Sequence, residues 1–278
     1  MRGFDLRPHR LAATLALLAA ACSGRTIVAV DPYPCADAGS NGCPGLLDDL
    51  VGYWHLDDAA GSTTARDWSG HGNNGLLAGL DPAVAWVQGG PAGGSLAPQG
   101  TGYVNVAPSA SIDSITNQVT VAAWIYLDGT LTDFATAISR QMGDGWGQLY
   151  HLSVDTDQKA ALYITNPATF VFLESPSTMP KQTWLHLAGT WDGAQVRLYV
   201  SGSEVASAAL SGPYGAETNP VILSGNGNGP GKGVSENIPG RLDDVMLYRR
   251  ALGADEIAKL AAGALLPSRA KSADGGGQ

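Results

Sequence analysis

The sequence predicts an all-β protein, a two-sheet antiparallel sandwich or jelly roll with one short helix near its C-terminus. Short strand-like runs separated by turn residues follow one another from Leu50 to about Tyr248, which is the pattern of antiparallel sheets. Only 15% of the residues are charged and 37 are Gly, as is typical of turn-rich β proteins. Strands do not alternate with helices over this stretch, so a parallel α/β sheet is not expected.

The first 21 residues have the features of an export signal. Arg2, Arg7 and Arg10 give a basic start, the short apolar run LAATLALLAAA follows, and Cys22 comes directly after it. The run is too short for a membrane-spanning helix, and its flanks are those of a secretory signal peptide. Because LAAAC resembles a bacterial lipobox, we expect Cys22 to carry a lipid anchor. An ordinary signal peptide that happens to contain a Cys is the alternative.

Residues 22–47 are rich in Pro, Gly, Ala and Ser, as in DPYPCADAGSNGCPG, and are expected to form a flexible tether. Cys35 and Cys43 are the two cysteines left if Cys22 is lipidated. An exported chain meets an oxidising environment, so we expect a local disulfide between them. Free thiols or metal ligands are alternatives that nearby residues do not support.

The body of the chain, residues 48–263, is expected to form one domain. Its strand-like runs are LVGYWHLD, TGYVNVAP, QVTVAAWIYLD, QLYHLSVD, AALYITN, TWLHLAGTWDG, QVRLYVSG and EVASAAL. DGAQ and SGSE between the last three runs read as hairpin turns, which predicts a three-stranded meander. RALGADEIAKLAA predicts the helix, with Asp255 and Glu256 near its positive N-terminal end. Residues 264–278 are expected to be a disordered tail.

Length and charge exclude some classes of function. The 278 residues suffice for a substantial core. A formal net charge of −9 argues against nucleic acid as a partner, because phosphate binding needs clustered Lys and Arg.

Five motifs in order resemble a known family. They are LVGYWHLDDAAGSTTARDWSGHGNNGLL, GTGYVNVAPSASID, QVTVAAWIYLD, TWLHLAGTWDGAQVRLYVSGSEVAS and GRLDDVMLYRRALGADEI. Together they resemble the laminin-G-like jelly-roll branch of the concanavalin A-like lectin/glucanase superfamily, over nearly all of residues 48–262. The resemblance implies two curved antiparallel sheets packed face to face.

The resemblance also implies a structural calcium ion between the loop DWSGHGNNG and the acidic strand near the C-terminus. The matching candidates are Asp67, His71, Asn73, Asp243 and Asp244. Calcium prefers carboxylate, amide and backbone oxygens, so His71 would offer at most its backbone carbonyl. The alternative is a tight turn in which Asp67 caps backbone N–H groups, with a solvated acidic pair elsewhere.

No catalytic residue is assigned. Related glucanases place an acid and a nucleophile in a Glu-x-Asp-x-x-Glu strand, and no Glu of this chain has that spacing. His55, His151 and His186 lie inside strand-like runs among apolar neighbours and are expected to be buried. The glycine-rich GNGNGPGKG lacks the Ser or Thr of a phosphate loop. We therefore expect that the protein is not an enzyme.

Four residues are candidates for ligand binding. Trp146 lies between glycines in MGDGWGQL and is the best candidate for an exposed sugar platform. Tyr214, Asn226 and Asn228 are expected to join it if their loops converge. The alternative, that Trp146 folds back over the end of the sandwich, remains open.

The sequence thus favours a module that binds a carbohydrate or glycoconjugate and contains calcium. We expect it to be anchored by lipid to the outer membrane or surface of a bacterium. The alternative is an adhesion or structural module that contacts envelope or extracellular proteins and has no glycan site. The fold hosts both kinds of role. In either case the membrane is contacted through the lipid alone.

Overall fold

The computed structural model describes residues 45–100, 102–143, 147–215, 217–227 and 233–265. All of them belong to one compact unit, residues 31–278. The predicted signal peptide, Cys22, the proposed pair Cys35 and Cys43, and most of the tether lie outside the described residues. So do Trp146 and Asn228.

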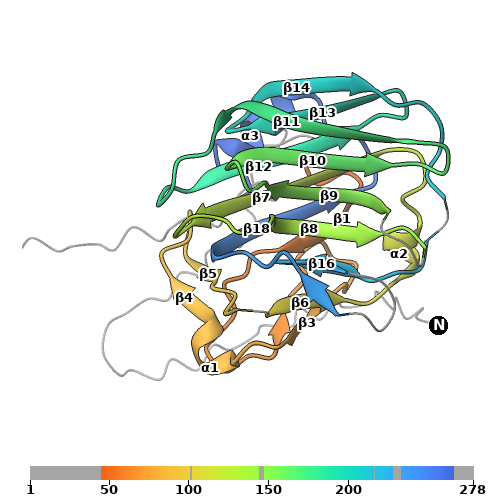
Figure 1. The fold of residues 1–278 in the computed structure, drawn as a ribbon. Coiled ribbons are helices and arrows are strands. Elements are labelled where there is room, and N and C mark those ends of the chain that lie inside the picture. Colours follow the sequence, from red (N-terminus) through yellow and green to blue (C-terminus); the bar gives the residue numbers. More distant parts are fainter. Residues whose placement is uncertain (1–44, 101, 144–146, 216, 228–232, 266–278) are drawn as a thin grey trace, which may run out of the picture. The chain divides into compact units, whose positions relative to one another are not determined.

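Two antiparallel sheets form the sandwich (Figure 1). Sheet I has the order β14 (Ser203–Ala209), β13 (Gln195–Val200), β12 (Leu185–Trp191), β7 (Val119–Leu127), β18 (Gly240–Tyr248), β5 (Gly94–Leu96) and β4 (Trp86–Gln88), and β1 (Leu50–Trp54) pairs with β18. Sheet II has the order β11 (Phe170–Thr178), β10 (Lys159–Thr165), β9 (Gln148–Val154), β8 (Ala135–Gln141), β15 (Val221–Leu223), β6 (Tyr103–Val106), β3 (Gly75–Ala78) and β2 (Thr64–Ala65). This arrangement confirms the predicted all-β jelly-roll sandwich.

The remaining elements are short. β16 (Asn226–Gly227) and β17 (Val234–Ser235) form a separate pair, and β16 lies against β8. Three helices occur in the described residues: α1 (Pro82–Ala85), α2 (Ala110–Asp113) and α3 (Ala254–Ala261). The predicted C-terminal helix is α3, where the Glu256 carboxylate accepts a hydrogen bond from the Gly253 N–H. That contact satisfies one of the free N–H groups at a helix start.

The main core lies between the sheets because strand side chains alternate and the apolar set faces inward. Its largest fully buried side chains include Trp54 and Trp191. The predicted meander is present, since β12 pairs with β13 and β13 with β14. Strands β8 and β11 were not among the predicted runs.

A second core covers the outer face of sheet I. Met246 and Tyr199 of that face are buried against Ile257 and Leu260 of α3, which lies over β12 and β14 (Figure 1). Leu46 and Leu265 join this core and are 0% and 2% exposed, and the Leu265 carbonyl accepts a hydrogen bond from the Tyr53 hydroxyl. Packing therefore extends at both ends beyond the expected limits of residues 48–263.

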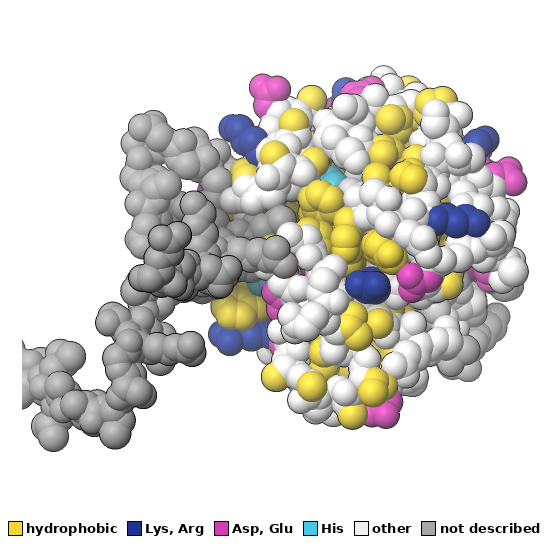
Figure 2. All heavy atoms as spheres, turned by 90° about the vertical axis from the view of Figure 1, so that its left-hand side faces the viewer, with side chains coloured by type: hydrophobic (Ala, Val, Ile, Leu, Met, Phe, Trp, Pro, Cys, Tyr) yellow, Lys and Arg dark blue, Asp and Glu magenta, His cyan; other side chains and the backbone are white. Residues whose placement is uncertain are grey.

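The surface reflects the low charge content of the chain. Figure 2 shows few Lys, Arg, Asp and Glu side chains on the face it presents, with hydrophobic side chains gathered across its middle. Among the helices of the described residues, none has both the length and the apolar character needed to cross a membrane.

Candidate ligand-binding site

Asp67 organises the loop DWSGHGNNG. Its Oδ1 accepts hydrogen bonds from the N–H groups of Tyr53 and Ser69, both at 2.9 Å. Its Oδ2 accepts from the Asn73 N–H and the Ser69 hydroxyl, both at 2.8 Å. Four donors of the chain thus surround a carboxylate that is only 7% exposed. These contacts match the tight turn that the sequence left open as the alternative to a metal loop.

Asn73 fastens the loop to the rest of the sandwich. Its Nδ2 donates to the Val51 carbonyl at 2.6 Å and to the Ser111 hydroxyl at 2.9 Å. Its Oδ1 accepts from the Ser109 hydroxyl at 2.6 Å. Asn73 is therefore a structural bridge to β1 and α2, whereas His71 is exposed.

Asp243 and Asp244 lie in a bulge of β18, where the register with β7 shifts. Asp244 Oδ1 accepts from the Tyr53 hydroxyl and lies 2.9 Å from His55 Nδ1. Burial, together with the nearby carboxylates of Asp244 and Asp57, raises the pKa of Asp243 far above its usual value. Desolvation penalises the charged form, and a like charge adds to the effect.

Calcium at Asp67, His71, Asn73, Asp243 and Asp244 stays a prediction. In the part of the chain that the structure describes, no group of three or more His, Cys, Asp or Glu is placed to hold a metal ion. Tyr53 adds a link to the backbone pairing of β1 with β18 and ties the loop to both strands. Its N–H donates to Asp67, and its hydroxyl donates to Asp244.

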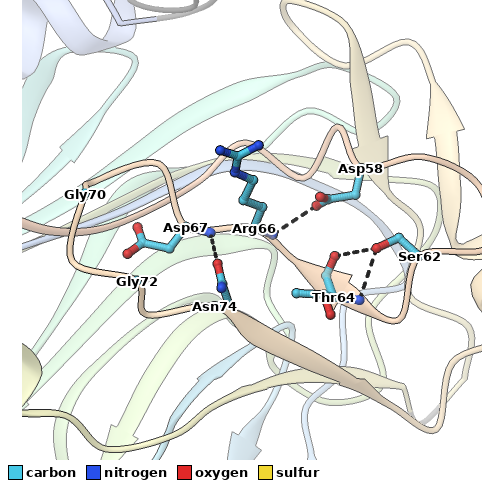
Figure 3. A pocket seen from close by; sticks show the side chains of 8 residues that line it. All are labelled: Asp58, Ser62, Thr64, Arg66, Asp67, Gly70, Gly72 and Asn74. Atoms are coloured by element: carbon cyan, nitrogen blue, oxygen red, sulfur yellow. Dashed lines mark hydrogen bonds between the residues drawn. The ribbon is translucent and has the colours of Figure 1, made fainter.

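A polar pocket of about 510 Å³ lies beside the loop (Figure 3). Its lining residues are Asp58, Ser62, Thr64, Arg66, Asp67, Gly70, Gly72 and Asn74. Figure 3 shows Asp58 and Asp67 on opposite sides of Arg66. The pocket thus combines carboxylate, hydroxyl, amide and guanidinium groups from two neighbouring chain segments.

Local contacts fix the pocket walls. The Arg66 N–H donates to Asp58 Oδ2 at 3.2 Å, and the Ser62 hydroxyl donates to the Thr64 carbonyl at 2.8 Å. The Asp67 N–H donates to Asn74 Oδ1 at 2.8 Å. The Arg66 guanidinium carbon lies 4.2 Å from the centre of the Trp68 ring. Such stacking holds the guanidinium plane and leaves its N–H edge available to a ligand.

Gly70 and Gly72 shape the rim of the pocket. Their φ angles are 89° and 73°, in the left-handed region that favours glycine. A Cβ added at either position would meet no atom within 4 Å. The loop therefore needs these glycines for its backbone path, and the space beside them stays open.

Two predicted ligand-binding residues are described, and neither forms an exposed platform. Tyr214 is 5% exposed, and its ring centre lies 4.4 Å from that of Trp191 in the core. Its expected role in an exposed site is therefore wrong, because the ring is used in packing. Asn226 is 9% exposed, and its Nδ2 donates to Glu236 Oε1 at 3.0 Å.

The three strand histidines are buried, as expected, with exposures of 4%, 6% and 1% for His55, His151 and His186. His151 Nε2 lies 2.6 Å from Thr136 Oγ1 and 2.8 Å from Glu236 Oε2. Neither ring nitrogen of His186 has a hydrogen-bond partner within the described ranges, and burial lowers its pKa to about 4.

Sequence reasoning missed the pocket itself. Asp58, Ser62, Thr64, Arg66 and Asn74 were not among the candidates. The signal was present in the polar stretch AGSTTARDWSGHGNN, where short polar residues surround a single Arg. Their convergence depends on the pairing of β2 with β3, which folds this stretch back on itself.

Comparison with known proteins gives a family and a fold. A family model described as the concanavalin A-like lectin/glucanases superfamily matches residues 98–258, more than half of the chain. No curated protein matches the sequence significantly.

Three solved structures illustrate the likeness of fold. The binding domain of Paraclostridial Mosquitocidal Protein 1 matches with a TM-score of 0.59 and 17% identity, over 78% of this chain and 53% of that chain. Domain 4 of an extracellular arabinanase from Geobacillus stearothermophilus, in complex with arabinotriose, matches with a TM-score of 0.56 and 17% identity, over 77% and 98%. A Trypanosoma rangeli sialidase matches with a TM-score of 0.57 and 16% identity, over 77% and 32%. The chain therefore spans about half the length of the first of these and a third of the sialidase.

Proposed function

The chain belongs to the concanavalin A-like lectin/glucanases superfamily, and from this premise we propose that it is a non-catalytic module that binds carbohydrate in the pocket beside the loop DWSGHGNNG. The observation that carries the proposal is the polar lining of that pocket. Most small-molecule sites are lined mainly by apolar side chains with a few polar groups. A pocket lined mainly by polar groups suits a ligand rich in hydroxyls.

The chemistry of the lining fits sugar hydroxyls, which both donate and accept. Arg66 supplies N–H donors, Asp58 supplies a carboxylate acceptor, and Asn74 supplies an amide that can do both. Partial burial raises the pKa of Asp58, although the Arg66 N–H and guanidinium lower it again in part. Hydrogen bonds that involve a charged partner are stronger than neutral ones.

The solved neighbours are consistent with a binding role. One is the binding domain of a mosquitocidal protein, and another is a domain in complex with arabinotriose. Others are sialidases, and at such low identity the likeness concerns the fold alone. We propose a role without catalysis because the sequence lacks the paired-carboxylate strand of the related glucanases.

Affinity electrophoresis tests this function. The purified protein should be retarded in gels that contain a neutral polysaccharide, and Arg66→Ala should remove most of the retardation. Arg197→Ala is the matched control, because Arg197 lies on β13 of the other sheet. A folded Arg66→Ala protein that is retarded like the wild type would contradict the assignment of the pocket. Reducing sugars should not be released, and their release would show catalysis.

An adhesion or structural module that contacts proteins is the second candidate. The observation that favours it is the burial of Tyr214, which removes one expected part of a glycan site. Absence of retardation in every polysaccharide gel, with capture of one defined envelope protein, would support this candidate.

Calcium remains a prediction from the resemblance. The contacts of Asp67 argue against the loop as its site, because the chain already supplies four donors to that carboxylate. A fall in Tm on chelation, reversed by added calcium, would support a bound ion elsewhere. An unchanged Tm, with no calcium found by elemental analysis, would remove the prediction.

Envelope anchoring is also part of the proposal. Lipidation at Cys22 would tether the soluble body to a membrane through acyl chains alone. Fractionation of cells tests this: Cys22→Ala should move the protein from the membrane pellet to a soluble fraction. A Cys22→Ala protein that stays in the pellet would contradict lipid anchoring.

A further inference from the structure

The pocket lies at one edge of the outer face of sheet II, whose two ends are exposed while its middle is covered: Ser139 and His151 are 0% and 6% exposed, the Ser139 hydroxyl donates to the Gly225 carbonyl, and β16 lies against β8. Directly paired residues share a face of an antiparallel sheet, and one such row crosses all eight strands. From β2 to β11 the row consists of Thr64, Leu76, Asn105, Ile222, Ser139, His151, Tyr163 and Phe172. The row begins at a pocket residue and ends at an aromatic side chain, on the order of 30 Å away at about 4.8 Å per strand.

The far end of this row is an aromatic strip formed by Tyr163, Phe170 and Phe172. The rings of Tyr163 and Phe170 are stacked, with centres 5.0 Å apart and planes at 19°. The ring of Phe172 lies 6.3 Å from that of Tyr163, with the planes at 52°. Phe170 is 56% exposed and Phe172 is 41% exposed. Exposed aromatic groups gathered at one place are typical of a binding surface.

The strip is suited to contact through its side chains and not through the edge of the strand. β11 is the edge strand of sheet II, and an open edge could pair with a strand of another chain. Pro176 within β11 has no N–H to donate. The register between β10 and β11 also shifts between Lys159 and Ala161. Both features disrupt a regular edge, which leaves the ring faces as the accessible surface.

The charges around the strip favour a neutral ligand. Glu174 is exposed two residues after Phe172 and interacts with Asp155, Asp157 and Lys159. Three acidic side chains and one basic side chain give this end of the sheet a negative net charge. That charge repels uronic acids, sulfated glycans and anionic lipid. Ring faces contact the apolar face of a neutral sugar, and nearby carboxylates accept from its hydroxyls.

We propose that the aromatic strip is a second carbohydrate-contacting subsite, on the same sheet face as the pocket, and that it selects long neutral glycans over short or anionic ones. The inference rests on the proposed function. The pocket holds one part of the glycan and the strip holds another part, so the affinity for the glycan increases with its length. Effective concentration makes the second contact stronger than its separate affinity.

Titration with graded neutral oligosaccharides tests the strip separately from the pocket. Short and long arabino- and xylo-oligosaccharides would be compared on the wild type, on Phe170→Ala/Phe172→Ala and on Arg66→Ala. The wild type should bind the long members about tenfold more tightly than the short ones, as two ring contacts suggest. The strip variant should keep the affinity for short members and lose the gain with length. Arg66→Ala should weaken both, and Val84→Ala, an exposed apolar control in α1, should change neither.

The outcomes separate the two proposals. If the strip variant gains affinity with length as the wild type does, the strip is not a subsite, while binding in the pocket stands. If the folded wild type binds no oligosaccharide, both proposals fail. Tighter binding of uronic-acid polymers than of neutral ones would overturn the selectivity. A dimer in ultracentrifugation that dissociates in the strip variant would assign the strip to a second copy of the chain.

Discussion

The two outer faces of the sandwich differ in what covers them. On sheet I, Met246 and Tyr199 are buried beneath Ile257 and Leu260 of α3. On sheet II, Thr64 at one end of the face lines the polar pocket, and Phe172 at the other end is 41% exposed. A sheet face that the chain covers with its own helix contributes to stability. The outer face of sheet II is covered in its middle, where Ser139 and His151 are 0% and 6% exposed, and its two exposed ends are available for a ligand.

The strongest expected contrast concerns packing. Ile257→Ala and Leu260→Ala should each reduce the free energy of unfolding by about 2–5 kcal/mol, because both remove fully buried side chains. Phe172→Ala should reduce it by about 1 kcal/mol or less, since the residue is 41% exposed. Urea unfolding of the three variants measures this. Equal losses would mean that the strip is part of the structural core.

The histidine on the covered face predicts a dependence on pH. Burial lowers the pKa of His186 from 6.5 to about 4, so below pH 6.5 the unfolded chain binds a proton that the folded chain does not. Stability is therefore lost as pH falls from 6.5 to 4, by up to about 3 kcal/mol in total. His186→Leu should flatten this part of the stability profile. An identical profile in the variant would contradict the buried neutral imidazole.

The partly buried carboxylate of Glu236, which lies against His151 of sheet II, titrates in a lower window. Burial raises the pKa of Glu236, but hydrogen bonds from His151, Asn226 and Thr136 outweigh it and leave the pKa below its usual value of 4.5. Its contribution is present above about pH 4.5 and is lost as pH falls through its lower folded value. Glu236→Gln should therefore alter the profile below pH 4.5, and His186→Leu should alter it above pH 4. If Glu236→Gln altered the stability profile above pH 4.5 and His186→Leu altered it below pH 4, the two assignments would have to be exchanged.

The link through Tyr53 gives a smaller effect. Tyr53→Phe removes the hydroxyl that donates to Asp244 and to the Leu265 carbonyl. These two buried acceptors share the single proton of that hydroxyl, and without it the free energy of unfolding should fall by about 1–3 kcal/mol. Thermal unfolding measures it, with Tyr103→Phe, whose side chain is partly exposed, as the control. No loss would mean that the backbone pairing of β1 with β18 holds the two strands without this hydroxyl.

The sequence predicted most of the fold because short-range patterns encode it. Alternation in QVTVAAWIYLD and the turns around QVRLYV identify β7 and the meander directly. Strand β11 was missed, since TFVFLESPST is apolar at successive positions and contains Pro176. Periodicity alone does not tell which of Phe170, Val171, Phe172 and Leu173 faces solvent.

The site was less predictable than the fold. Asp67 was recognised as central, but whether its carboxylate receives N–H groups or an ion depends on the surrounding backbone, which the motif does not specify. Tyr214 resembled a surface residue because glycine and proline surround it, yet long-range packing places it on Trp191. Arg66 and Asn74 meet only through strand pairing, so no local spacing points to them.

A glycan and polysaccharide array of the purified protein, with Arg66→Ala and Arg197→Ala beside the wild type, tests the central claim most directly. The account predicts wild-type signals on neutral glycans, their loss in Arg66→Ala and their retention in Arg197→Ala. A blank array for folded wild-type protein, or signals that Arg66→Ala leaves unchanged, would contradict carbohydrate binding in the pocket.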